Sequence, residues 1–285
     1  MKCRFASSLA LAFVLVAEPG SAQSFETPAE AVVIGQGYDL ASAILGDERR
    51  INVSLPVGYD SEEAAAERYP VLFVLDGGDG WQDFGHISTM VQQGGTWGAN
   101  APMIVVGIRS EDRRAEFTTP TSDPKELEDF PTSGKAADFR RFLVEELQPA
   151  IDAAYRTNGT KGVIGESLAG LFITDLFLNH PTSFTHYIAV DPSFWWNRGQ
   201  LSHRAGELLS ASNTPNRHFW MSMADEGGEM QAGADRVVEA LREEGPDHVE
   251  WRYRAFPDES HATIYHPAAT EAVRYMFPAP EVGAD

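Results

Sequence analysis

The sequence has little cysteine and little positive charge. Cys3 is the only cysteine among 285 residues, so neither a disulfide framework nor a cysteine-ligated metal site is expected. Aspartate and glutamate number 42 against 22 lysines and arginines, which gives a formal charge of −20. Such a chain repels nucleic acid and anionic membrane surfaces. No apolar run approaches the roughly 20 residues of a membrane span, so neither a nucleic-acid partner nor a membrane span is expected.

The short motifs of the common cofactor and metal sites are also missing. We find no H-E-x-x-H zinc motif, no cysteine cluster, no phosphate-binding loop and no dinucleotide glycine fingerprint. The expected chemistry therefore uses the chain's own side chains, with no cofactor and no metal. A hydrophobic fraction of 43% is enough for a buried core and argues against disorder.

The first 22 residues predict a secretory signal peptide. A basic start is followed by an apolar run over 9–17 and by a small-residue site that ends at Ala22. On this interpretation Cys3 is removed with the signal, and the mature protein is periplasmic or secreted. Residues 23–285 then form a single domain.

Short apolar runs alternate with amphipathic segments along the rest of the chain. Strands joined by helices at this spacing predict an α/β fold with a mostly parallel, doubly wound sheet flanked by helices. The polar, proline-interrupted segment 109–133 has the length of a functional loop or lid. The expected strands cover 38–45, 50–55, 71–75, 104–108, 161–165, 187–190, 218–223 and 249–256, and the expected helices 81–91, 134–155, 168–179, 229–243 and 263–276.

One stretch combines an apolar strand, a tight turn and a helix around a single serine. It runs Val-Ile-Gly-Glu-Ser-Leu-Ala-Gly over 163–170. A serine at such a corner exposes its Oγ at the carboxyl edge of a sheet. The small residues Gly165 and Ala169 fit where strand and helix nearly touch. The stretch predicts Ser167 as a nucleophile, although short matches of this kind also occur in ordinary glycine-flanked loops.

An acid and a histidine follow later strands, in the order serine, acid, histidine that α/β-hydrolases use. His261 comes directly after strand 249–256 and is expected to be the general base. Ligands bind beyond the carboxyl ends of parallel strands, so these groups are expected to meet at one sheet edge. We expect Glu226 to orient the histidine, ahead of Asp225 and Glu229. At least two of these three acids would then lie in a solvated turn.

Two backbone N–H groups are expected to bind the oxyanion. One belongs to Leu168, directly after the nucleophile. The other belongs to Gly77 or Gly78, in the glycine-rich turn after strand 71–75. Glycines there allow the backbone to approach a substrate, and a plain turn is the alternative for either one.

Two arginines and two tryptophans near the same edge are candidates for substrate binding. Arg109 and Arg113 follow strand 104–108 in an otherwise acidic chain. They would clamp an anionic substrate or lie in a solvated loop. Trp195 and Trp196 follow strand 187–190, where they would line a pocket or pack into the core.

Several further stretches of the chain belong together. They are Leu75-Asp76-Gly77, Val106-Gly107-Ile108-Arg109 with Arg113, Thr119-Pro120, Gly165 to Phe172, Asp191-Pro192-Ser193-Phe194-Trp195-Trp196 and Pro257-Asp258-Glu259-Ser260-His261. In their order and spacing, from about residue 35 to 277, they resemble the putative esterase family of the α/β-hydrolases, and within it the siderophore-esterase branch, of the ferri-bacillibactin and enterobactin type, fits best. The resemblance implies an α/β-hydrolase fold in which Ser167 is the nucleophile and His261 the base. Two positions depart from the family: Ala169 replaces a frequent glycine, and Asp191 stands where a serine is common.

The sequence thus predicts a secreted serine esterase that hydrolyses a small-molecule carboxylic ester through an acyl-enzyme. Siderophore-type esters are the substrates that the resemblance implies. A feruloyl or other carbohydrate ester, and acyl transfer to an alcohol instead of water, are the alternatives within enzymes. A non-catalytic binding protein on a hydrolase scaffold is the alternative of another class, because a fold does not fix a function.

Overall fold

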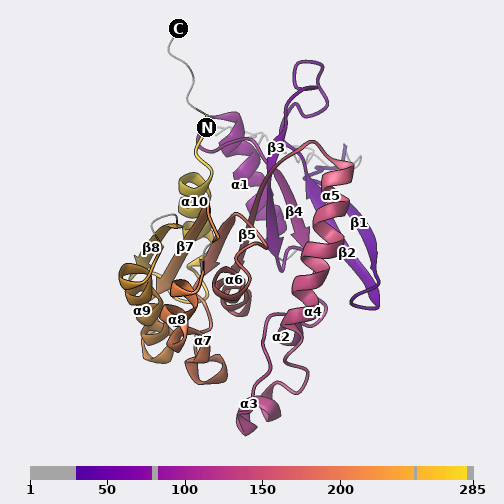
Figure 1. Cartoon of the computed structure of the whole chain (residues 1–285). Helices are drawn as coiled ribbons and strands as arrows, with labels where there is room; N and C mark the ends of the chain where they lie inside the picture. The colour runs from indigo at the N-terminus through magenta and orange to yellow at the C-terminus, as the bar shows by residue number, and fades with distance from the viewer. Residues whose placement is uncertain (1–29, 79–82, 213, 247–248, 281–285) are drawn as a thin grey trace, which may run out of the picture. The chain divides into compact units, whose positions relative to one another are not determined.

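One eight-stranded sheet runs through the part of the chain that the structure describes (Figure 1). The computed structural model describes residues 30–78, 83–212, 214–246 and 249–280. Its contacts divide the chain into Met1–Val33 and Ile34–Asp285, and every described helix and strand belongs to the second unit. The predicted signal peptide lies outside the described residues.

The strand order is β1-β2-β4-β3-β5-β6-β7-β8. The pairs β1–β2 and β2–β4 are antiparallel, and the other five pairs are parallel. The predicted α/β fold with a mostly parallel sheet is therefore confirmed. The strands are β1 (Gln36–Ser42), β2 (Asp47–Ser54), β3 (Tyr69–Leu75), β4 (Ile104–Ile108), β5 (Thr157–Glu166), β6 (His186–Val190), β7 (Arg217–Ala224) and β8 (Val249–Phe256).

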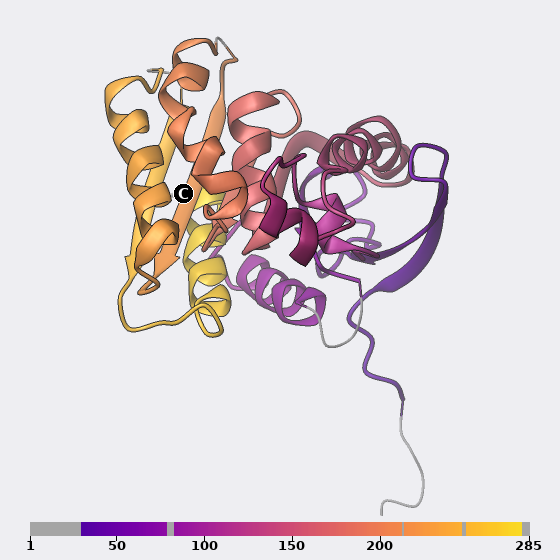
Figure 2. The same cartoon turned by 90° about the horizontal axis from the view of Figure 1, so that it is seen from below.

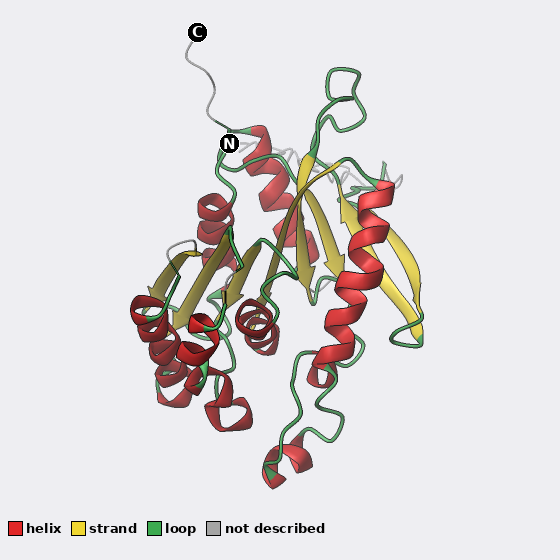
Figure 3. Cartoon of the chain, in the orientation of Figure 1, coloured by secondary structure: helices red, strands yellow, loops and turns green. Residues whose placement is uncertain are grey.

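Helices cover both faces of this sheet (Figure 3). Helices α1 and α10 pack together on one face, and α6 lies on the other with the α4–α5 segment and α9 (Figure 2). The helices are α1 (Phe84–Thr96), α2 (Arg113–Glu116), α3 (Pro124–Asp129), α4 (Ala136–Arg141), α5 (Gln148–Ala154), α6 (Leu168–Asn179), α7 (Gln200–His203), α8 (Ala205–Ser210), α9 (Gly228–Glu243) and α10 (Tyr265–Met276), with a π-helical turn over Phe142–Leu147 and a 3-10 turn over Trp196–Gly199.

The continuous apolar strands supply two cores because neighbouring side chains of a strand point to opposite faces. In β3, Phe73 packs with α6, whereas Leu72 and Val74 pack with α1 and α10. All three side chains are fully buried. The central strands are therefore fixed between two packed layers of helices. The sheet edge at which their loops begin is fixed with them.

Most predicted elements are found within a few residues of their expected bounds, and β4, α6 and β8 match them fully. The hairpin turn differs: it ends at Gly46, whose φ is +76°, and β2 begins directly after it. The predicted helix 134–155 is interrupted by the π-helical turn just before Pro149. Proline has no N–H to continue the ordinary helical ladder, which favours a change of winding there.

The segment 109–133 carries two short helices that the sequence did not predict, α2 and α3. Asp112 and Asp123 cap them by accepting backbone N–H groups. Among the described residues, we find no helix whose length and apolar character would let it span a lipid bilayer.

Candidate active site

Ser167 occupies a strained corner between β5 and α6. Its φ is 64° and its ψ is −120°, a combination that costs a non-glycine residue on the order of 1–3 kcal/mol. Its N–H donates to the carbonyl of Val190 at 3.0 Å, which ties the corner to β6. A Cβ on Gly165 would lie 2.6 Å from the Cβ of Ala169. The predicted need for small residues at this corner is therefore confirmed.

The Ser167 side chain has a neighbour that the sequence did not single out. Ser167 Oγ and Ser193 Oγ are 3.1 Å apart, and the Ser193 N–H donates to the Ser167 carbonyl at 3.1 Å. Ser193 lies in the loop after β6 and is buried. This loop therefore contacts Ser167 through both its backbone and a side chain.

His261 comes to the same sheet edge in the loop between β8 and α10, and a carboxylate holds its ring. His261 Nδ1 is 2.5 Å from Asp191 Oδ2. The side chain of Asp191 is 0% exposed, whereas that of His261 is 42% exposed. A buried acid on Nδ1 leaves Nε2 as the nitrogen that can accept a proton.

The predicted choice of acid is wrong. Among the described residues, neither Glu226 nor Asp225 hydrogen-bonds to the imidazole ring. Glu226 Oε1 instead accepts the backbone N–H of His261 at 2.7 Å. Asp225 is exposed, and Glu229 pairs with Arg236. Glu226 therefore holds the loop that carries the histidine, while Asp191 orients the ring.

Asp191 reaches His261 across the end of an intervening strand. It follows β6, and β7 lies between β6 and β8, with neighbouring strands about 4.8 Å apart. Asp191 Oδ1 accepts the N–H of Ala224, the last residue of β7, at 2.9 Å. This bond directs the other carboxylate oxygen toward His261. The sequence places Asp191 at the right edge but does not give the direction of its side chain.

The surroundings of His261 favour its charged form. The hydrogen bond to Asp191 is the largest cause that moves its pKa, and it raises that pKa above the ordinary value for histidine. Burial opposes the shift, and the charges of Asp191, Glu166 and Glu226 add to it. A histidine that serves as a general base must be neutral before it accepts a proton. Any reaction that uses His261 in this way is therefore expected to slow as the pH drops through its raised pKa.

The glycine-rich turn after β3 contributes less to the oxyanion site than predicted. The Gly77 N–H donates to the carbonyl of Ile108 at 2.9 Å, so it is not available to an oxyanion in this arrangement. Asn52 Nδ2 donates to the carbonyls of Gly77 and Gly78 at 3.1 and 2.6 Å and fixes the turn from β2. A role for Gly78 in binding an oxyanion stays a prediction, and so does that of Leu168. Leu168 is in the first turn of α6, where N–H groups have no acceptor inside the helix.

The close approach of Arg109 explains why residue 78 is glycine. A Cβ on Gly78 would lie 2.0 Å from the Cβ of Arg109. Any larger residue would push the turn away from β4. The close approach of the two backbones therefore sets the position of this turn.

The two predicted substrate-binding arginines both have protein partners. Arg113 binds Asp76 Oδ2 through Nη2 at 3.0 Å and through Nε at 3.2 Å. Arg109 Nε lies 3.4 Å from Glu111 Oε1. Both arginine side chains are 42% exposed, and exposed ion pairs of this kind are weak. A role in binding an anionic substrate stays a prediction.

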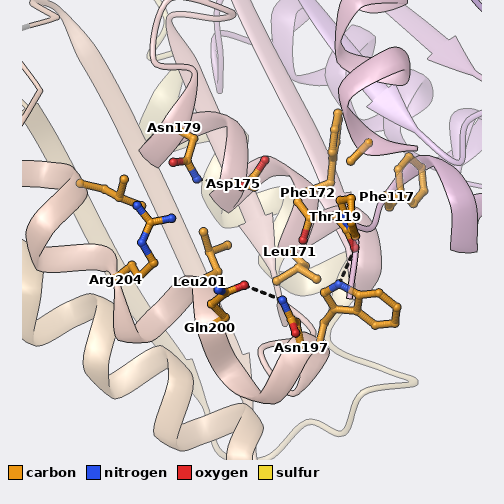
Figure 4. A pocket seen from close by; sticks show the side chains of 14 residues that line it. Phe117, Thr119, Leu171, Phe172, Asp175, Asn179, Asn197, Gln200, Leu201 and Arg204 are labelled. Atoms are coloured by element: carbon orange, nitrogen blue, oxygen red, sulfur yellow. Dashed lines mark hydrogen bonds between the residues drawn. The ribbon is translucent and has the colours of Figure 1, made fainter. Parts of the chain in front are cut away.

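The two predicted tryptophans differ in their environment. Trp196 is buried, and its Nε1 donates to the Thr119 carbonyl at 3.0 Å. It lines a cavity of about 200 Å³ beside α6, together with Leu171 and Phe172 of that helix (Figure 4). Trp195 packs on Phe130 with ring centroids 5.6 Å apart and is not among the residues that line this cavity. Trp196 is therefore a pocket wall as well as a core residue.

Asp191, Glu226 and His261 also form a cluster whose candidate ligand atoms lie within 4.8 Å of one another. Two carboxylates and an imidazole could hold a divalent ion. Asp191 Oδ2, His261 Nδ1 and Glu226 Oε1 are, however, already paired within the protein by the hydrogen bonds described above. We therefore interpret the cluster as an acid–histidine pair with a second carboxylate that supports the loop.

The chain is similar to known esterases along most of its length. The family model described as "Putative esterase" matches residues 42–266. The ferri-bacillibactin esterase BesA of Bacillus subtilis is 27% identical over 233 residues, which cover 73% of this chain and 79% of that protein.

Two solved structures are similar in fold. An IroE-like serine hydrolase from Shewanella oneidensis has a TM-score of 0.75 at 23% identity, covering 85% of this chain and 80% of its own. The BES protein from Bacillus cereus has a TM-score of 0.76 at 22% identity, covering 88% and 99%.

Proposed function

Because the chain belongs to the Putative esterase family, and is a carboxylic ester hydrolase by that kinship, we propose that Ser167, His261 and Asp191 form its catalytic triad. The observation that carries this proposal is a strained serine at the same sheet edge as a histidine whose ring is held by a buried carboxylate. These are the three groups that acyl transfer by a serine requires.

In the proposed reaction, Ser167 Oγ attacks the ester carbonyl while His261 Nε2 takes its proton. Ser167 Oγ and Ser193 Oγ are 3.1 Å apart, and either hydroxyl can be the donor. In the proposed reaction Ser193 donates, which leaves the Ser167 proton for His261. Catalytic hydrogen bonds often tighten only when the substrate is bound. The Leu168 N–H stabilises the oxyanion, and His261 returns the proton to the leaving alcohol. Water then releases the acid from Ser167 by the same steps.

Labelling with a fluorophosphonate probe tests the proposed nucleophile. We expect the purified protein to be modified at Ser167, because an activated serine attacks the phosphorus as it would an ester. Mapping of the modified peptide by mass spectrometry identifies the site. Modification elsewhere, or a folded protein that takes no label, would count against Ser167 and favour a binding protein.

For the substrate we propose a siderophore-type ester. One support is the similarity to a ferri-bacillibactin esterase. The other is the presence of two part-exposed arginines, Arg109 and Arg113, near the carboxyl edge of the sheet in an acidic protein. These arginines would offset the long-range repulsion between the protein and an anionic substrate.

A panel of esters separates this substrate class from the feruloyl alternative. We expect kcat/KM for a ferric catecholate lactone to exceed that for a feruloyl sugar ester by about tenfold or more, the effect of one well-placed charge contact. A higher kcat/KM for the feruloyl ester would overturn the substrate assignment but leave the esterase function intact. Transfer to an added alcohol in place of water would identify an acyltransferase.

We also propose that the protein is exported and cleaved after Ala22, on the basic start and small-residue site of its N-terminal sequence. The mass of the protein recovered from the periplasm or medium checks this. An intact N-terminus on protein confined to the cytoplasm would reject it.

A further inference from the structure

Glu166 lies directly before the nucleophile, but its side chain is on the face of β5 opposite to α6. Ile164 packs with α1 and α10, and Gly165 faces Ala169 of α6. Because strand side chains alternate, Glu166 points to the face that α1 and α10 cover. Its partner in β6 is Val190, the residue before the acid that holds His261.

The loop that carries His261 leads to this same face, because it continues into α10 at Tyr265. Two buried polar atoms are left without a hydrogen-bond partner among the described residues there: Glu166 Oε1 and the Tyr265 hydroxyl. Because no described donor offsets the charge at Glu166 Oε1, that charge acts on neighbouring groups, and it favours the protonated form of His261.

Charged groups from several elements act on Glu166. Burial is the main cause that raises the pKa of Glu166, to about 7. The charges of His261 after β8 and Arg113 on α2 lower it, and those of Asp83 before α1 and Asp191 after β6 raise it. Asp83 in turn contacts His266, which stacks on His86. Tyr265 on α10 is buried, which raises its pKa, and the charges of Asp83, Glu166 and Asp76 add to that shift.

We propose that Glu166 is a positioning residue that acts through His261: its ionised carboxylate stabilises the imidazolium that forms when Ser167 gives up its proton. Three carboxylates then support one histidine. Asp191 binds the ring, Glu226 binds the backbone N–H, and Glu166 supplies charge from the end of β5. The inference rests on the proposed function, because it assigns Glu166 a role only in the serine esterase reaction.

This role has a pH dependence that distinguishes it from a structural one. Glu166 is ionised above about pH 7 and neutral below it. A neutral glutamic acid and a glutamine have nearly the same shape and the same charge. The variant Glu166→Gln should therefore behave like the native enzyme at low pH and differ from it only at high pH.

The test compares kcat/KM for a small neutral ester, p-nitrophenyl acetate, from about pH 5.5 to 9.5. We expect the native enzyme and Glu166→Gln to agree within about twofold at the low end, and the variant to be about tenfold slower at the high end, as expected for loss of a charge near a developing cation. The native profile should show two coupled ionisations on its acid side, and the variant one.

Glu243→Gln is the matched control, since it removes an equal charge from an exposed position at the end of α9. The ratio of its kcat/KM to that of the native enzyme should stay constant with pH. An equally constant kcat/KM ratio for Glu166→Gln would overturn the inference. Absence of native turnover at every pH would instead reject the proposed function itself.

Asp83→Asn gives a second, independent measurement that does not alter Glu166. The charge of Asp83 raises the pKa of Glu166, so its removal should move the Glu166 ionisation in the rate profile to lower pH. A pH profile of kcat/KM that is the same in Asp83→Asn as in the native enzyme would contradict the role of Glu166.

Discussion

Replacement of Ser167 by alanine is expected to lower kcat/KM by on the order of 10⁴-fold or more while the protein stays folded. The loss follows because Ser167 Oγ is the only atom of the proposed triad that forms a bond to the acyl group. The substitution removes one oxygen atom from a half-buried position, so the circular dichroism spectrum should not change. Steady-state kinetics on p-nitrophenyl acetate measure the effect.

Ser193→Ala is the matched control for this change. It removes a hydroxyl 3.1 Å from Ser167 Oγ but leaves the nucleophile in place. We expect a loss of about tenfold or less, the usual size of one neutral hydrogen bond. Turnover in Ser167→Ala close to that of the native enzyme would reject Ser167, and a larger loss in Ser193→Ala than in Ser167→Ala would exchange their roles.

Asp191→Asn is expected to lower kcat by about 10³–10⁴-fold. The Ala224 N–H requires an oxygen at the position of Asp191 Oδ1, so the asparagine NH₂ group would face His261 Nδ1. That NH₂ group donates, which forces Nδ1 to accept and places the proton on Nε2. Nε2 could then no longer take the proton of Ser167. Single-turnover kinetics, which isolate acylation, measure this loss.

The acids that the sequence favoured provide the comparison. Glu226→Gln keeps an oxygen that can accept the His261 N–H, and Asp225→Asn changes an exposed side chain. Each should cost about tenfold or less. The pH profile adds a second check: since Asp191 raises the pKa of His261, Asp191→Asn should move the acid limb of its residual activity to lower pH. A loss in Glu226→Gln as large as that in Asp191→Asn would restore Glu226 as the triad acid.

The elements that the sequence predicted well depend on local patterns. Continuous apolar runs gave β3 and β4, and the alternation of strands with amphipathic segments gave the parallel sheet. The turn around Ser167 was predictable because the steric demand for small residues falls on neighbours in the chain, Gly165 and Ala169. His261 was predictable from chain order together with its position after a strand.

The errors concern interactions between distant segments. The second oxyanion donor was predicted at Gly77 or Gly78, but the Gly77 N–H is taken by the carbonyl of Ile108, 31 positions along the chain in a neighbouring strand. The short helices α7 and α8 were not predicted either, because their few apolar residues, such as Leu209, are buried against α9 rather than in a long periodic stripe.

By itself, the sequence determined a parallel α/β sheet, the corner that carries Ser167 and the sheet edge at which His261 arrives. These features follow from hydrophobic periodicity and from steric limits between residues close in the chain. Only the tertiary structure decided which acid holds the histidine, because the choice depends on the order β6-β7-β8 and on the bond from Ala224 that turns Asp191 across the end of β7. A hydrogen bond between residues 70 positions apart leaves no local pattern in the sequence, since its geometry exists only after the strands have paired.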